Sequence, residues 1–245
     1  MITTEMTVRD VAMELPQSTR IFEQLKIDYC CGGDNSLAQA CASAGVDVDN
    51  LIEMLAEVTQ STSQDSVLDF QTASLTELIS HIVDTHHVFT KSELDRLQSL
   101  ADKVLAAHGG NHPELVHLGE LLTHLSADLK PHMFKEELIL FPYIIAMTAA
   151  ADQNLGAPVA PFGTVNNPIR MMMREHDTAG EILRELRSLT SDYKVPDDAC
   201  ASYQTLYQAL ENFETDLHQH IHLENNILFP KAIDLENELN SSGGI

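Results

Sequence analysis

The segments HMFKEELILFP (residues 132–142) and HIHLENNILFP (residues 220–230) align without a gap. Each has a histidine at its first position, a glutamate at its fifth, and Ile-Leu-Phe-Pro at its end. Four residues make about one turn of an α-helix, so the histidine and the glutamate share one helix face. An imidazole and a carboxylate in that arrangement can bind one metal ion or two adjacent ions. The repeat therefore predicts a metal site on two helices of a helical fold.

Both His-Glu pairs interrupt apolar stripes whose members follow steps of three and four residues. The first stripe consists of Leu118, Leu122, Leu125, Leu129, His132, Glu136 and Ile139, and the second of Leu206, Leu210, Phe213, Leu217, His220, Glu224 and Ile227. Such stripes face the core of a helical bundle. A carboxylate there is costly unless it is paired or bound to metal. The pattern predicts a buried metal site.

The composition limits the class of protein. The 245 residues include 37 acidic and 14 basic side chains, which gives a formal net charge of −23. This charge would repel nucleic acid and anionic membranes, and it suits a protein that attracts cations. No apolar run reaches membrane-spanning length, and residues 1–6 lack the features of a signal peptide. We expect a cytoplasmic protein that binds neither nucleic acid nor membrane.

The helical patterns predict an all-α protein in which a small helical domain precedes a four-helix bundle. We place the leader domain at residues 1–58, a polar linker at 59–73 and the bundle at 74–240. In the leader, Thr7 and Asp10 form a predicted capping box, and further helices are expected at 37–44 and 48–58. The bundle helices are expected to begin at Ser74, Pro113, Asn167 and Pro196. Pro142 and Pro230 predict kinks or breaks just after the two His-Glu pairs.

The other two bundle helices should each contribute a ligand. On the third helix, His176 is the one polar member of the inward stripe. On the first helix, His86 and His87 compete, and His87 is preferred because its apolar stripe is longer. His108, His112, His117, His124, His218 and His222 are expected to be solvated.

Four histidines and two glutamates suit two metal ions that share both carboxylates. Each ion would take two imidazoles and one oxygen from each bridging glutamate, with room for a bridging oxygen and an exogenous ligand. Mixed imidazole and carboxylate ligation favours iron, with manganese or zinc less favoured. A structural zinc site is not expected without cysteine ligands.

Cys30 and Cys31 are adjacent, and two glycines follow them. A disulfide between neighbours requires a strained ring, so a structural bridge is not expected. Exposed thiolates here could bind a metal or nitric oxide, accept electrons, or pair with another subunit in a homodimer. The alternative is two buried, inert cysteines in a turn. Cys41 and Cys200 are expected to be ordinary core residues.

The order His, His-x-x-x-Glu, His, His-x-x-x-Glu on four helices resembles the hemerythrin-like di-iron bundle. Residues 28–33, Asp-Tyr-Cys-Cys-Gly-Gly, after a short helical region, resemble the leader domain of the iron–sulfur cluster repair di-iron proteins, the ScdA/RIC/YtfE group. The resemblance implies an oxo-bridged di-iron centre, and it places the family's ligands on His87, His132, Glu136, His176, His220 and Glu224. It also places Glu175 at an acidic position near the centre. Asp128 stands where the family often has glutamate.

Three functions stay open at this point. The resemblance implies a stress-response protein that acts on damaged iron–sulfur proteins by supplying iron or handling nitric oxide. The alternatives are a carrier or sensor of oxygen or nitric oxide, and an enzyme such as a nitric oxide reductase or peroxidase. The thiol pair favours the first, because a carrier does not need it. Four histidines instead of five argue against a pure oxygen carrier.

Overall fold

The computed structural model describes residues 2–30, 32–60 and 70–242. Within these ranges the regular structure is helical, and the one extended pairing is an isolated bridge between Thr7 and Ser36. The chain divides into two compact units, residues 1–74 with 218–230, and residues 75–217 with 231–245. Among the described helices, none is long and apolar enough to span a membrane. The predicted all-α class is confirmed.

Residues 2–30 and 32–60 contain four short helices: α1 (Val8–Glu14), α2 (Ser18–Leu25), α3 (Leu37–Ala44) and α4 (Val48–Gln60). Their apolar faces enclose a small core of their own, which includes Val8, Val11, Phe22, Tyr29, Leu37, Cys41, Leu51 and Leu55. The linker expected at residues 59–73 includes residues 61–69, which lie outside the described residues. Its extent therefore stays a prediction.

Local sequence signals account for most of the leader helices. The Thr7 hydroxyl accepts a hydrogen bond from the Asp10 amide at 3.0 Å and caps α1. Ser36 and Gln39 form a reciprocal capping box at the start of α3, and Gly45 ends that helix with a φ of +69°. Helix α2 was not predicted, because Gln17 precedes it without a side-chain capping bond. Its buried residues Ser18, Ile21 and Phe22 follow the i, i+3, i+4 spacing of a helix face, and this spacing is the signal that could have indicated it.

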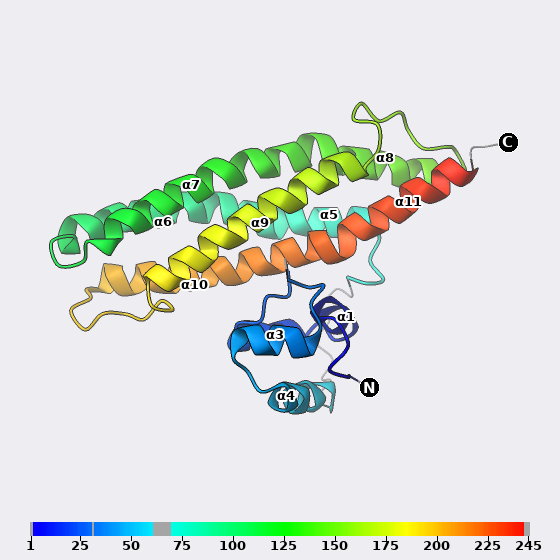
Figure 1. Ribbon diagram of the computed structural model, residues 1–245. Helices are drawn as coiled ribbons and strands as arrows, with labels where there is room; N and C mark the ends of the chain where they lie inside the picture. The colour runs from blue at the N-terminus through cyan, green and yellow to red at the C-terminus, as the bar shows by residue number, and fades with distance from the viewer. Residues whose placement is uncertain (1, 31, 61–69, 243–245) are drawn as a thin grey trace. The chain divides into compact units, whose positions relative to one another are not determined.

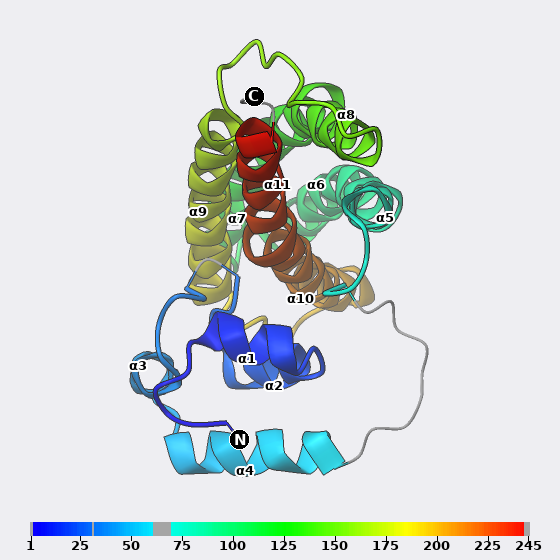
Figure 2. The ribbon, with the colours of Figure 1, turned by 90° about the vertical axis from the view of Figure 1, so that its right-hand side faces the viewer.

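Four long helical segments form the bundle (Figure 1). They are α5 (Leu75–His81), η1 (Ile82–His87) and α6 (Val88–His108); α7 (Glu114–Lys135), η2 (Glu136–Leu140) and α8 (Phe141–Asp152); α9 (Asn166–Leu189); and α10 (Ala201–His222), η3 (Leu223–Leu228) and α11 (Phe229–Ser242). Helix α7 packs against both α6 and α9. Figure 2 shows the bundle from one end, with its four segments around a common axis.

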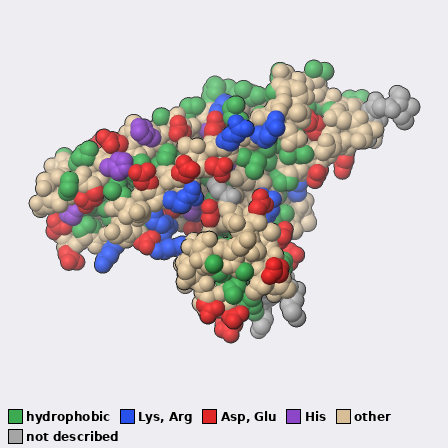
Figure 3. All heavy atoms as spheres, viewed as in Figure 1, with side chains coloured by type: hydrophobic (Ala, Val, Ile, Leu, Met, Phe, Trp, Pro, Cys, Tyr) green, Lys and Arg blue, Asp and Glu red, His purple; other side chains and the backbone are tan. Residues whose placement is uncertain are grey.

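Most members of the predicted apolar stripes line the interior of the bundle, but Ile139 of the first stripe is 48% exposed. Ile139 lies in η2, where the extra residue of a π-helical turn rotates side chains away from the α-helical face. Leu118, Leu122, Leu125 and Leu129 are buried on α7, as are Leu206, Leu210, Phe213 and Leu217 on α10. Acidic side chains are spread over the surface that Figure 3 shows, as the net charge of −23 requires. Because these stripes face the interior, their polar members, the two His-Glu pairs, also lie inside the bundle.

Two predicted helix starts differ from the structure. The fourth bundle helix begins at Ala201, not at Pro196. The third begins at Asn166, and the predicted capping side chain of Asn167 instead donates to the Phe162 carbonyl at 2.8 Å. At the start of α9, the acceptor is instead Glu236 of α11: its buried carboxylate accepts a hydrogen bond from the Val165 amide at 2.9 Å. A distant residue thus supplies the cap that the local sequence was expected to supply.

The helix is π-helical just before the two matched prolines, whereas kinks or breaks were predicted there. Segments η2 and η3 end shortly before Pro142 and Pro230, and η1 is a third such segment. Proline is not their common cause, because η1 has no proline near it and Pro131 lies inside the regular helix α7. All three segments carry or adjoin predicted metal ligands.

Candidate metal centre

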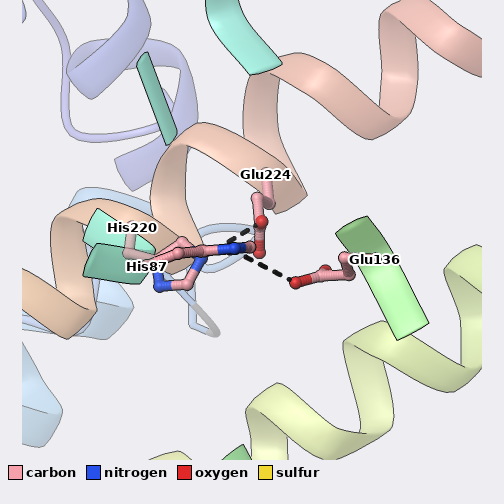
Figure 4. Close-up of side chains that lie close together, drawn as sticks. All are labelled: His87, Glu136, His220 and Glu224. Carbon is pink, nitrogen blue, oxygen red and sulfur yellow. Dashed lines mark hydrogen bonds and ion pairs between the residues drawn. The ribbon is translucent and has the colours of Figure 1, made fainter. Parts of the chain in front are cut away.

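All six residues predicted as ligands are buried, and they form two overlapping groups. One group contains His87, Glu136, His220 and Glu224, and the other contains His132, Glu136, His176 and Glu224. Within each group, one ligand atom per residue lies within 4.8 Å of all the others. Figure 4 shows the first group, with the side chains of its four members directed toward one another. Both glutamates belong to both groups, as expected for bridging carboxylates.

The distances between ligand atoms fit metal coordination. Glu136 Oε2 lies 3.5 Å from His87 Nε2 and 3.3 Å from His132 Nε2. The Nε2 atoms of His132 and His176 face each other at 3.0 Å. Two ligands of one ion lie about 3 Å apart when metal–nitrogen bonds are about 2.1 Å long and the angle between them is about 90°. The donor set therefore fits metal ions.

Three of the predicted ligands lie in π-helical turns. His87 is the last residue of η1, Glu136 the first of η2, and Glu224 the second of η3. A π-turn contains one residue more than an α-helical turn and rotates the following side chains relative to a regular helix. Such turns often occur at functional sites. Their presence at three ligand positions separates this region from the rest of the bundle.

Two of the histidines predicted as ligands, His87 and His132, each have a carboxylate at the Nδ1 nitrogen. Glu137 Oε1 lies 2.7 Å from His87 Nδ1, and Glu175 Oε2 lies 2.8 Å from His132 Nδ1. A carboxylate on Nδ1 fixes the ring orientation and the tautomer, which leaves Nε2 for the metal. The sequence placed Glu175 near the centre but missed Glu137, which follows a ligand directly. A carboxylate adjacent to a predicted ligand was the available signal.

Each of these carboxylates also binds a lysine located about one turn after the histidine. Lys91 Nζ lies 2.6 Å from Glu137 Oε1, and Lys135 pairs with Glu175. The hydrogen bond from His132, followed by that from Lys135, lowers the pKa of Glu175 to about 2. Burial alone would raise the pKa of Glu137, but hydrogen bonds from Lys91 and His87 lower it. Both carboxylates are therefore anionic at neutral pH.

His86 lies apart from both ligand groups. Its side chain is buried, and its Nδ1 is 3.0 Å from Asp216 Oδ1. The preference for His87 as the ligand of the first helix agrees with the composition of the first group. The sequence could not have identified the Asp216 contact, because the two residues are 130 positions apart.

Two histidines that were expected to be solvated on the fourth helix are not. His222 is buried, and burial lowers the pKa of its imidazole to about 4. His218 is partly buried, with its Nδ1 2.8 Å from Glu23 Oε1. Both rings contact the ring of Tyr29 edge-on. In the unit made of residues 1–74 and 218–230, this face of the helix is covered by protein and not by water.

The cysteines differ from expectation in two places. Cys30 is only 4% exposed, whereas the reactive-thiol interpretation assumed exposure, and its Sγ lies 3.4 Å from Asp28 Oδ1. Cys31 lies outside the described residues. Cys41 is a core residue, as predicted. Cys200 was also predicted to be a core residue, but it lies just before α10 and is exposed. Hydrogen bonds from the Tyr203 amide and from His108 lower the pKa of the Cys200 thiol to about 7.

Comparisons with known proteins agree with this arrangement. Residues 78–232 match the family "Hemerythrin HHE cation binding domain", and residues 4–59 match a "Domain of Unknown function (DUF542)" named ScdA_N. "Iron-sulfur cluster repair protein YtfE" of Dickeya chrysanthemi is 36% identical over 229 residues, which cover 94% of this chain and 97% of the relative.

Two further relatives have similar coverage. A "Probable iron-sulfur cluster repair protein" of Haemophilus influenzae is 34% identical over 92% of this chain and 95% of its own length. The YtfE protein of Citrobacter koseri is 36% identical over 91% and 94%, respectively. Hemerythrin HHE domains bind a pair of iron ions, and the two groups described above can hold them. Because one domain family spans residues 78–232 and these relatives match over nearly their whole length, the chain belongs to the YtfE group of the hemerythrin HHE family.

Proposed function

We propose that the protein repairs iron–sulfur clusters damaged by nitric oxide or oxidants, and that the six buried residues hold the iron pair on which this activity depends. The observation that carries the proposal is the sharing of Glu136 and Glu224 between the two ligand groups. Shared carboxylates favour two adjacent ions over two independent sites. The relatives, which are named as iron–sulfur cluster repair proteins, supply the reaction class.

The protein's own residues have three tasks in this proposal. Four imidazoles and two carboxylates bind the ions, and Glu137 and Glu175 orient His87 and His132 through Nδ1. The surrounding leucine and phenylalanine side chains limit the access of water to the ligands. When bound, the iron pair supplies redox chemistry and positions for a small ligand such as nitric oxide or oxygen.

The targets follow from the repair activity. We propose damaged iron–sulfur proteins as partners, which this protein meets in the cytoplasm of a bacterial cell. The described cysteines Cys30, Cys41 and Cys200 form no disulfide with one another, which fits a reducing compartment. The bacterial sources of the relatives support the same location.

The test is recovery of an iron–sulfur hydro-lyase that has been inactivated with nitric oxide. The damaged enzyme is incubated without oxygen with the iron-loaded protein, and its activity and the iron content of both proteins are measured. We expect recovery with the parent protein, and no recovery above the spontaneous rate with the Glu136→Ala/Glu224→Ala double variant. Transfer of iron to the target would identify a donor, whereas loss of nitric oxide without transfer would identify nitric oxide handling.

The His86→Ala variant is the matched control, because His86 is buried beside the centre but belongs to neither ligand group. It should support recovery as the parent does. If the double variant, shown to contain no iron, repaired the target as well as the parent, the proposed role of the centre would be wrong.

A further inference from the structure

Asn226 has an environment that metal ligation does not explain. It lies in η3, two residues after Glu224, and its side chain is only 2% exposed. Its amide nitrogen donates to the Tyr29 carbonyl at 3.0 Å and to His222 Nδ1 at 2.8 Å. Its amide oxygen accepts from Arg9 Nε at 2.7 Å. Both donor hydrogens and the oxygen are therefore used within one unit of the protein, which leaves the side chain a single orientation.

The Tyr29 carbonyl belongs to the peptide bond that joins Tyr29 to Cys30. Asn226 thus holds the backbone at Cys30, and the side chain of Tyr29 adds a second attachment. Its hydroxyl donates to Glu23 Oε1 at 3.0 Å, and the same oxygen lies 2.8 Å from His218 Nδ1. Tyr29 is therefore attached to the helix at two points: through Glu23 to His218, which precedes His220 and Glu224 in the sequence, and directly to Asn226, which follows them.

Gly33 and Asp34, which follow the cysteines in the sequence, are held by Arg9, which also donates to Asn226. Arg9 donates through its backbone amide to the Gly33 carbonyl at 2.9 Å, and its Nη1 pairs with Asp34 at 2.9 Å. A Cβ added to Gly33 would lie 3.2 Å from the Tyr29 carbonyl oxygen and 3.3 Å from the Arg9 Cβ. The absence of a side chain at residue 33 therefore permits this close approach. The glycine after the thiols has a packing role at the Asn226 attachment.

We propose that Asn226 is a positioning residue that couples the reactivity of the Cys30 thiol to metal occupancy of the centre. The same helical turn carries Glu224 as a proposed ligand and Asn226 as the attachment of the Cys30 backbone. Binding of metal by His220 and Glu224 restrains this turn and keeps the Cys30 loop closed. Loss of metal loosens the turn, and the loop opens more often and exposes the thiol. The inference rests on the proposed ligands and does not require repair activity.

The burial of Cys30 makes this coupling measurable. At 4% exposure, its thiol reacts with an alkylating reagent only when the loop opens, so the rate reports the population of the open state. Loss of a buried amide with its hydrogen bonds should raise that population by about tenfold or more. Residue-resolved mass spectrometry after reaction with N-ethylmaleimide separates Cys30 from the other cysteines.

The experiment compares the full-length parent protein with the Asn226→Ala variant, each in metal-free form and after anaerobic loading with iron. In the parent, iron should slow the alkylation of Cys30. In Asn226→Ala the rate should be high in both forms, so the dependence on iron disappears. If the variant keeps the parent's dependence, the proposal is overturned, because iron would then protect the thiol by another route, such as direct binding. A parent protein without any dependence on iron would overturn it equally.

Three controls separate coupling from simple destabilisation. Leu138→Ala changes the position that corresponds to Asn226 in the first repeat, where the side chain is 60% exposed, and it should behave as the parent does. Cys41, in the leader core, should stay unreactive in every sample; equal acceleration at Cys41 would mean that the leader unfolds, and would contradict the proposal. Arg9→Met removes one bond to Asn226 and should reduce the dependence on iron, which decides the matter if Asn226→Ala does not fold.

The iron content is measured in the same samples. A parent protein that binds no iron would refute the proposed metal centre itself. A parent protein that binds iron normally but shows equal Cys30 rates in both forms would refute the coupling alone.

Discussion

The two repeats at residues 132–142 and 220–230 share their proposed ligands but not their surroundings. Each contributes a histidine and a glutamate that belongs to both ligand groups, and each contains a π-helical turn. On the outward side they differ. Phe134 and Leu138 are exposed in the first repeat, whereas their counterparts His222 and Asn226 are buried in the second.

This difference shows that the inward and outward residues of one helical motif are determined by different contacts. The inward His and Glu are the same in both repeats, as the proposed shared metal centre requires. The outward positions differ because the second repeat belongs to a unit with residues 1–74, whereas the first repeat does not. Polar residues at outward positions of a helix are ordinarily expected in water. Here His222 and Asn226 serve contacts with Tyr29 and Arg9.

The largest expected effect tests the equivalence of the inward faces. Glu136→Ala and Glu224→Ala each remove a carboxylate that both ligand groups share, so each variant should lose both ions. Metal analysis after iron reconstitution measures this directly. The metal-bound parent should also unfold at a higher temperature than either variant, because metal binding stabilises the folded state. Retention of both ions by one of the two variants would show that the repeats are not equivalent.

A smaller loss distinguishes the two halves of the centre. His87 belongs only to the group that contains His220, and His176 belongs only to the group that contains His132. His87→Ala and His176→Ala should therefore each weaken one ion and retain the other, while His86→Ala retains both. Iron titration with a spectroscopic readout separates these results. Loss of iron in His86→Ala with full retention in His87→Ala would contradict the assignment of the first helix.

The carboxylate of Glu137 should have a more modest effect. It occurs only in the first repeat, since Asn225 occupies the matching position of the second. Glu137→Ala removes the group that orients His87, and such losses weaken metal binding by roughly 10–100-fold. Lys91→Ala should weaken it less, because Lys91 acts only through Glu137. Competition with a chelator ranks the variants, and the opposite ranking would mean that the lysine has a role of its own.

The smallest effect concerns the exposed outward positions. Phe134→Ala and Leu138→Ala remove side chains that are mostly in water, so each should change the free energy of unfolding by less than about 0.5 kcal/mol. Asn226→Ala removes a buried, fully bonded amide and should cost about 1–3 kcal/mol. Denaturant unfolding of the metal-free proteins compares them. A large effect of Leu138→Ala would indicate that the first repeat is also covered in solution.

Much of the fold was predictable because the bundle follows hydrophobic periodicity. The stripes through Leu118 and Leu206 are buried as expected except at Ile139, and the six candidate ligands lie at polar interruptions of such stripes. Helix α2 was missed because a short helix without a capping side chain leaves little local signal. The burial of Cys30 was predicted only as the alternative to an exposed thiol, and Cys200 was predicted in the core but is exposed; cysteine occurs in both environments.

The sequence by itself determined the helices, the spacing of His and Glu, and the repeat that presents them on one face. These are local properties, because residues four apart share a helix face whatever surrounds the helix. Only the tertiary structure decided which groups meet across the fold, as in the pairs Glu137 with His87, Glu236 with the start of α9, and Asn226 with the Cys30 loop. These contacts join residues about 50 to 200 positions apart, and their formation depends on how the helices rotate and pack. Helical periodicity carries no information about such partners.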